Sequence, residues 1–315
     1  MPKAVYFLML PNVLSLDVSG PAEVLRLSSQ FQLHYVSPVP QVTCSIGMTI
    51  GQLPPLPAQL ADGDILVVPG VADSTTFFAN QEAAQARQWL SGLQPALAQQ
   101  RFSLVCVCSG ALLAAQAGLL DGYHCTTHHN VLTRLRQQAP AAQVRENRIF
   151  VEDRGVFTSA GITAGIDLAL HLVNQQCGAN RALEIAREMV IYFRRSGDDP
   201  QLSPWLRYRN HLHPAVHRAQ DVMAAEPEAD WSVPLVAEKA HVSSRHLARL
   251  FRQHIGISVR EYHEQLRLAV AQQRLQQGYG LEKAALTAGF SSGRQLRRAQ
   301  QRQDRAHLMI AKASN

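Results

Sequence analysis

A nine-residue pattern occurs twice in the last third of the sequence, at residues 236–244 and again 48 residues later at residues 284–292. The first copy reads VAEKAHVSS and the second reads AALTAGFSS. Each copy predicts a short helix, a tight turn and a pair of serines that open a second helix, where a serine hydroxyl can accept from the free backbone amides. The repeat therefore predicts two helix-turn-helix units, joined by a long amphipathic helix at residues 259–277.

The second helix of each unit combines an apolar face with a basic face. Leu247, Leu250 and Phe251 recur at helical spacing in the first unit, and Leu296 and Ala299 take the inward positions in the second. Arginines dominate the remaining positions of both helices. A guanidinium can bind a phosphate, or the O6 and N7 atoms of guanine, with two hydrogen bonds. A solvated basic helix would explain one such pattern, whereas two of them after matching turns predict a DNA-binding surface.

Charge is unevenly distributed along the chain. Residues 207–315 contain 17 Lys+Arg and 9 Asp+Glu, a net charge of +8, and residues 1–206 contain 13 and 15, a net charge of −2. A basic second half favours a polyanionic partner, although a basic surface that serves only solubility is an alternative on charge alone.

The first part of the chain alternates apolar runs with amphipathic segments. This alternation predicts an α/β domain with a parallel sheet covered by helices on both faces. The expected strands are residues 5–10, 33–37, 65–69, 102–107 and 156–159, and the expected helices are residues 21–27, 82–97, 111–119, 163–174 and 181–193. We predict a first domain at residues 1–193, a linker at 194–212 and an all-helical domain of seven helices at 213–315.

The apolar runs and the cysteines of the sequence predict a cytoplasmic protein. No apolar run reaches the length of about 18 residues that a membrane span needs. Residues 4–10 are too short for a signal peptide and lack a cleavage site, so they predict a buried first strand. The five cysteines are an odd number without the paired spacings of a disulfide framework, which favours reduced thiols.

Cys108 stands where an apolar run meets the start of a helix. The small residues Ser109 and Gly110 follow it and permit a sharp turn. A cysteine at such an elbow is exposed, and a helix N-terminus lowers its pKa, so the position suits a nucleophile. The backbone amides of Ser109 and Gly110 would be free to bind an anion. The alternative is a buried apolar cysteine, which is our interpretation of Cys106.

Residues 213–302 resemble the AraC/XylS family of transcription regulators. The resemblance rests on residues 235–237, 243–252, 256–258, 266–267 with Ala271, and 288–292. It implies that the two units share one linker helix and place their second helices in successive segments of the DNA major groove. The implied contacts to double-stranded DNA are Ser244, Arg245, His246, Arg249, Ser292, Arg294, Gln295 and Arg298.

The chain departs from the AraC/XylS pattern in three places. Val259 replaces a usual proline, Gln300 stands where a core phenylalanine is expected, and residues 301–315 lack the signature of the closing helix. A polar residue in a core lowers stability unless it is hydrogen-bonded. The second helix-turn-helix unit is therefore expected to be looser than the first.

Residues 3–193 resemble the class I glutamine amidotransferase-like fold, in the branch that includes intracellular-protease-like proteins and isonitrile hydratase. The resemblance rests on residues 17–23, 67–70, 108–111, 117–122, 126–128 and 158–167. It implies a flavodoxin-like parallel sandwich. In enzymes of the branch the elbow cysteine is a nucleophile or redox centre, supported by a carboxylate and sometimes a histidine. The implied ligand-binding residues are Asp17, Glu23, Gly70, Cys108, Ser109 and His128.

Two functions are compatible with these features. In the first, a small molecule binds beside Cys108 and modulates DNA binding without turnover. The resemblance implies a nitrogenous metabolite as a candidate, because several regulators that fuse these two folds respond to one. It also implies a homodimer with its interface in the first half of the chain, because proteins of both families commonly dimerise. In the second, Cys108 is also catalytic, with Asp17 or Glu23 as acid/base and His128 in support. Ser109 stands where protease-like members carry a histidine, so no close base is evident and we predict a regulator rather than an enzyme.

Two histidine-containing groups have weaker interpretations. Cys125, His128 and His129 have a crude metal-ligand spacing, but the amidotransferase-like motif already accounts for His128, so neither a metal nor a cofactor is predicted. The histidines of residues 211–217 are expected to form a solvated, weakly pH-sensitive joint.

Overall fold

The computed structural model describes residues 2–74, 79–191, 195–198, 201, 208, 211, 213–276 and 278–313, with no side chains described at 276 or 304–313. The chain divides into two compact units, Met1–Gln201 and Leu202–Asn315. Most of the predicted linker, 194–212, lies outside the described residues. Among the residues that the structure describes, no helix is both long and apolar enough to cross a membrane.

The first unit is built on a six-stranded sheet in the order β2-β1-β5-β6-β10-β9. Its strands are β1 (Lys3–Leu8), β2 (Phe31–Val36), β5 (Ile65–Val68), β6 (Ser103–Val107), β9 (Phe150–Asp153) and β10 (Val156–Ser159). The five strands predicted from sequence are present within two residues at each end and run parallel. The sequence analysis missed β9, which pairs antiparallel with β10 at the sheet edge.

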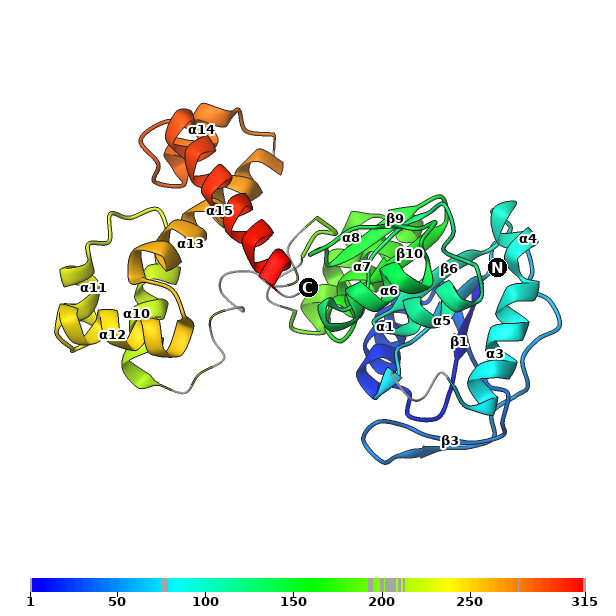
Figure 1. Cartoon of the computed structure of the whole chain (residues 1–315). Helices are drawn as coiled ribbons and strands as arrows, with labels where there is room; N and C mark the ends of the chain where they lie inside the picture. The colour runs from blue at the N-terminus through cyan, green and yellow to red at the C-terminus, as the bar shows by residue number, and fades with distance from the viewer. Residues whose placement is uncertain are drawn as a thin grey trace. The chain divides into compact units, whose positions relative to one another are not determined.

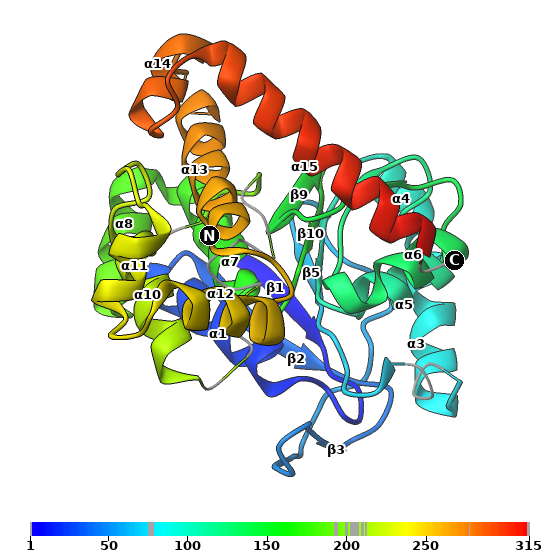
Figure 2. The same cartoon turned by 60° about the vertical axis from the view of Figure 1, so that its left-hand side comes forward.

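Helices cover both faces of this sheet, as predicted (Figures 1 and 2). One face packs against α1 (Ser15–Ser28), α7 (Ala164–Cys177) and α8 (Ala179–Glu188), and the other against α3 (Gln81–Gly92), α4 (Gln94–Ala98), α5 (Gly110–Gln116) and α6 (Leu132–Gln138). Within β5, Ile65 and Val67 point to the first core, while Leu66 and Val68 point to the second. Every residue of this strand is therefore buried, which explains its uninterrupted apolar sequence.

The predicted helix bounds for the first unit were inexact. The helices expected at residues 111–119, 163–174 and 181–193 end at Gln116, Cys177 and Glu188. The segment 82–97 is interrupted at Leu93 and forms α3 and α4. Helix α1 begins at Ser15 rather than at residue 21, so Pro21 lies inside the helix although proline usually marks a first turn. The remaining elements are short: β3 (Val42–Thr43) with β4 (Thr49–Ile50), β7 (His124–Cys125) with β8 (Gln143–Val144), and the 3₁₀ helix η1 (His129–Val131).

The second unit is entirely helical, as predicted. Its described residues form six helices rather than seven, because the tail continues the last helix without a break: α10 (Pro214–Ala225), α11 (Val233–Lys239), α12 (Ser244–Ile255), α13 (Val259–Gln276), α14 (Leu281–Thr287) and α15 (Gly293–Ala313). Helix α13 belongs to two cores. Val259 and Leu266 pack with α10, α11 and α12, whereas Leu268 and Ala271 pack with α14 and α15.

Candidate functional site

Cys108 occupies a strained turn between β6 and α5. Its φ is +56°, in the left-handed region that non-glycine residues rarely adopt. Two glycines make the turn possible. A Cβ on Gly110 would lie 2.0 Å from Val68 O, and a Cβ on Gly161 would lie 2.1 Å from Cys108 Cβ. The elbow is therefore held by close backbone packing on two sides.

The Asp17 carboxylate lies against this elbow. The residue is fully buried in the first turn of α1, and its two oxygens accept from Ile162 N at 2.6 Å and Gly70 N at 3.1 Å. The thiol of Cys108 also hydrogen-bonds to the carboxylate. Burial raises the pKa of Asp17 to about 6, even though these three hydrogen bonds favour the ionised form. Asp17 is thus a buried acid that titrates close to neutral pH.

The Cys108 thiol is protonated at neutral pH. Burial raises the pKa of Cys108 far above its ordinary value, and the Asp17 charge raises it further, while the Ser109 backbone amide has a smaller, opposite effect. The prediction of an exposed, low-pKa thiol was wrong, because only 6% of Cys108 is exposed and desolvation outweighs the adjoining helix end. This environment disfavours nucleophilic chemistry.

The structure gathers four of the six predicted ligand-binding residues at one place. A Cβ on Gly70 would lie within 3 Å of atoms of Asp17, Cys108 and Ser109. The Ser109 hydroxyl accepts from Val71 N at 3.0 Å, which fixes the loop after β5. The sequence analysis missed Thr127, whose hydroxyl donates to Cys108 O at 2.7 Å. Thr127 belongs to the quoted stretch 126–128, so the signal was present but was assigned to its neighbour.

Glu23 and His128 lie apart from this group. Six residues separate Asp17 from Glu23, which places their side chains about 120° apart around a helix, and the exposed Glu23 carboxylate pairs with Arg26. His128 is half-buried at the start of η1 and accepts from Asn130 N at 3.3 Å. Burial and the nearby His129 lower the pKa of His128. Among the described residues, no hydrogen bond joins His128 to Cys108.

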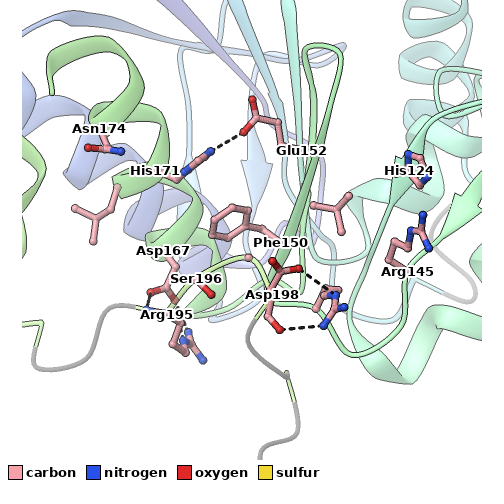
Figure 3. A pocket seen from close by; sticks show the side chains of 14 residues that line it. His124, Arg145, Phe150, Glu152, Asp167, His171, Asn174, Arg195, Ser196 and Asp198 are labelled. Atoms are coloured by element: carbon pink, nitrogen blue, oxygen red, sulfur yellow. Dashed lines mark hydrogen bonds and ion pairs between the residues drawn. The ribbon is translucent and has the colours of Figure 1, made fainter. Parts of the chain in front are cut away.

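A cavity of about 820 Å³ opens elsewhere in the first unit, between α7, β9 and residues 195–198 (Figure 3). Phe150, Glu152, Asp167, His171 and Arg145 are among its lining residues, and Cys108 is not. Its charged groups are largely paired with one another: His171 contacts Glu152 at 2.6 Å and Arg195 contacts Asp167 at 2.6 Å. In the part of the chain that is described, no three His, Cys, Asp or Glu side chains form a group suited to a metal ion.

The first helix-turn-helix consists of α11, a turn and α12. The Ser243 hydroxyl accepts from His246 N at 3.3 Å and caps α12, as the repeat predicted. Leu247, Leu250 and Phe251 are buried, which confirms the inward face. The turn passes through His241 with a φ of +57°.

The second helix-turn-helix consists of α14, a turn and α15. Gly289 replaces His241 in the turn, with a φ of +79°, and a Cβ there would lie 2.2 Å from Glu228 O. Ser292 caps α15 by accepting from Gln295 N at 3.3 Å. The cap therefore comes 49 residues after Ser243, one more than the spacing of the repeat.

Because the cap is shifted by one residue relative to the repeat, the inward and outward faces of α15 are shifted by one residue as well. Leu296 and Ala299 are buried, as expected, and Gln300 takes the place of Phe251 but is only half-buried. Gln295 is engaged within the helix start, because its Oε1 accepts from Ser291 N at 2.6 Å and from the Ser291 hydroxyl at 2.9 Å. Only its amide nitrogen is left without a hydrogen bond among the described residues.

Exposed arginines line both capped helices. They are Arg245, Arg249 and Arg252 on α12, and Arg294, Arg297 and Arg298 on α15. Arg252 lies 3.6 Å from Glu261. Within the described residues, no carboxylate pairs with the other five, so their charge is available to a polyanion.

Comparisons with known proteins match both units. Residues 3–175 match the DJ-1/PfpI family, and residues 236–304 match a helix-turn-helix domain. The HTH-type transcriptional regulator GbdR of Pseudomonas aeruginosa is 31% identical over 306 residues, covering 92% of this chain and 79% of GbdR. The chain belongs to the AraC-type transcriptional regulators that carry a DJ-1/PfpI domain. The HTH-type transcriptional regulator ArgR of the same species is 28% identical over 301 residues, covering 93% of this chain and 87% of ArgR.

A third relative matches only part of the chain. Isonitrile hydratase of Pseudomonas putida is 35% identical over 187 residues, covering 56% of this chain and 73% of the enzyme. Among solved structures, a ThiJ/PfpI family protein from Pseudomonas syringae is similar in fold, with a TM-score of 0.54 and 24% identity, covering 76% of this chain and 89% of that one. The relatives that match nearly the whole chain are regulators, which confirms the prediction of a regulator rather than an enzyme.

Proposed function

We propose that this regulator binds a specific double-stranded DNA site through α12 and α15 and that a small metabolite bound at the Cys108 elbow modulates the binding. The observation that carries the proposal is the pair of capped, arginine-bearing helices in matching helix-turn-helix units. The residues proposed to contact DNA are Ser244, Arg245, His246, Arg249, Ser292, Arg294, Gln295 and Arg298.

Helix α13 supports readout of two neighbouring groove segments. Its 18 residues span about 27 Å at 1.5 Å per residue. One half of the helix packs into the core of the first helix-turn-helix and the other half into the core of the second. A rigid spacer of this length suits two major-groove contacts about one helical turn apart. The hydroxyls of Ser243 and Ser292 cap α12 and α15 and so hold the first turn of each helix in place. Base contacts would therefore come from fixed backbone positions.

The topology of the first unit supports a ligand site at the elbow. Asp17, Gly70 and Cys108 follow the carboxyl ends of β1, β5 and β6, and the strand order reverses between β1 and β5. Ligands of open α/β sheets bind at this kind of switch point. The buried Asp17 carboxylate favours a ligand with a hydrogen-bond donor, which fits a small nitrogenous metabolite. Glu23 and His128, because of their positions, are not included in this proposal.

We further propose a homodimer formed through the first unit, in the cytoplasm, with the linker within residues 194–212, of which 195–198 and 201 pack on the first unit. Ile46 and Met48, beside β3 and β4, are 65% and 59% exposed. Exposed apolar side chains of this size favour a protein contact over solvent.

Selection of genomic DNA fragments tests the proposed function directly. The purified protein is mixed with a fragment library at about 0.15 M salt, and the bound fragments are sequenced. We expect enrichment of one motif with two half-sites about a helical turn apart, and loss of that enrichment in Arg249→Ala. Binding that is salt-sensitive but indifferent to sequence would overturn the proposal.

A further inference from the structure

Gln201 ties the end of the first unit to the loop beside Cys108. It is the last residue of that unit, and only 7% of it is exposed. Its side-chain amide donates to Thr127 O at 2.7 Å and to Arg148 O at 2.9 Å. The buried Thr127 in turn donates to Cys108 O. Two side-chain hydrogen bonds thus connect the elbow with the residue at which the chain leaves the unit.

The segment just before Gln201 is docked on the same unit. Arg195 donates to the buried Asp167 carboxylate through its guanidinium at 2.6 Å and through its backbone amide at 3.0 Å. Gly197 O accepts from Ile149 N at 3.1 Å, and a Cβ on Gly197 would lie 2.8 Å from Phe150 O. The docked segment forms one wall of the cavity in Figure 3.

We propose that Gln201 is a positioning residue that couples the Cys108 site to the docking of residues 195–198 and 201, and so to DNA binding. The inference rests on the proposed function. A ligand at the elbow that prefers one position of Thr127 would favour or disfavour the Gln201 contact, because a ligand shifts only an equilibrium whose two states it binds unequally. Docking would thereby be the local change that the second unit senses.

Release of this segment changes the length of the tether between the units. The first unit ends at Gln201 and the second begins at Leu202. Release of the described contacts from Arg195 to Gln201 would add seven residues to the chain that separates the units, or up to about 25 Å when extended. In the proposed homodimer, the length of this connection sets the effective concentration at which the DNA-binding unit of one protomer finds its half-site once the other protomer is bound. The contact at Gln201 can therefore alter affinity without any change within the second unit.

One buried atom makes the docked arrangement easy to disturb. Gln201 Oε1 is buried without a hydrogen-bond donor among the described residues, while Nε2 faces acceptors on Thr127, Arg148 and, at 3.5 Å, Thr126. An unpaired buried acceptor destabilises the docked state. The docked state is therefore less stable than a fully paired one, so a shift of Thr127 that weakens the 2.7 Å contact would favour release of Gln201.

The rate of Cys108 alkylation by iodoacetamide tests the coupling without a known effector, because coupling between two sites is reciprocal. The full chain is labelled with and without the DNA fragment enriched in the selection, and Cys108 is quantified by peptide mass spectrometry, with the half-buried Cys177 as internal reference. The variants are Thr127→Val and Gln201→Met. Gln175→Met is the matched control, since the Gln175 amide donates to Glu152 on the outer surface.

We expect DNA to change the Cys108 rate at least about fivefold in the wild type and in Gln175→Met, and less than about twofold in Thr127→Val and Gln201→Met. All variants should keep the wild-type melting temperature within a few degrees. An unchanged rate in a wild type that binds its DNA would overturn the inference and leave the proposed function intact, as would a full response in both variants. Absence of specific DNA binding would instead refute the proposed function.

Discussion

The carboxylate of Asp17 and the thiol of Cys108, 91 residues apart in the sequence, share a buried hydrogen bond in the first unit. Burial brings the pKa of Asp17 to about 6, although the Cys108 thiol has a small opposite effect. Burial raises the pKa of Cys108 as well, and the Asp17 charge adds to that rise. The pair therefore places a titratable charge at the proposed ligand site, next to a thiol that is held protonated. This arrangement suits sensing better than nucleophilic turnover.

Removal of the Asp17 charge should make Cys108 more reactive. In Asp17→Asn the carboxylate no longer disfavours the thiolate, so the thiol pKa falls and alkylation by iodoacetamide at pH 8 should accelerate about tenfold, which corresponds to one pKa unit. Glu23→Gln is the control, because the exposed Glu23 side chain pairs with Arg26 and should leave the rate unchanged. Equal rates in Asp17→Asn and the wild type would contradict the assigned hydrogen bond.

Stability of the first unit should rise on mild acidification through Asp17. The pKa of this residue is about 6 in the folded state and about 3.9 in the unfolded chain. The folded state therefore binds the proton first, and protonation stabilises it as pH falls from 7 to 4. Relative to Asp17→Asn, the wild type should gain about 2 kcal/mol in unfolding free energy over this range. Urea unfolding read by pulsed hydrogen exchange in β6 measures the difference; a flat difference curve would refute the raised pKa.

Gly161→Ala should destabilise the first unit by about 2–4 kcal/mol, because it combines a left-handed backbone with overlap in a packed site. Gly161 has a φ of +81°, and its Cβ would lie 2.1 Å from Cys108 Cβ. Gly63→Ala is the matched control. Gly63 has a φ of +89° with open space around it, so it should lose only about 1 kcal/mol. Equal losses in the two variants, measured by urea unfolding, would mean that the elbow is not tightly packed.

Arg249→Ala should reduce binding to the selected DNA site. If Arg249 reads a base, affinity for the site should fall by about 1–3 kcal/mol and specificity should relax at one position. If it contacts phosphate, affinity should fall for all sequences with a shallower salt dependence. Arg101→Ala removes the same charge from the first unit, where Arg101 pairs with Asp62, and should have no effect. Unchanged binding by Arg249→Ala, measured by fluorescence anisotropy, would argue against α12 as a reading helix.

The two helix-turn-helix turns should tolerate substitution differently. Gly289→Ala should lower the stability of the second unit by about 2–4 kcal/mol, since its Cβ would lie 2.2 Å from Glu228 O. His241→Gly at the equivalent turn should be neutral or stabilising by up to about 1 kcal/mol, because glycine adopts the left-handed φ of +57° without strain. Thermal unfolding measures both, and a harmless Gly289→Ala would contradict the close packing at that turn.

Local sequence pattern was sufficient for most of the architecture. Five apolar runs became the parallel strands of the sheet, and the repeat with its serine pairs became two helix-turn-helix units. These predictions succeeded because hydrophobic periodicity and capping act over a few residues of contiguous chain. The pattern did not predict β9, because a four-residue edge strand depends on its partner β10 for its conformation.

The sequence by itself determined that Cys108 would sit at a turn with small neighbours, and that arginines would line two capped helices. Only the tertiary structure decided the state of the thiol, because burial and the distant Asp17 charge outweigh the local helix end. The tertiary structure also places Asp17 rather than Glu23 beside Cys108, because only one of these two carboxylates on the same helix is buried. The Thr127–Gln201 contact joins residues 74 positions apart. Such long-range contacts depend on how packed elements meet in space, which no stretch of contiguous residues specifies.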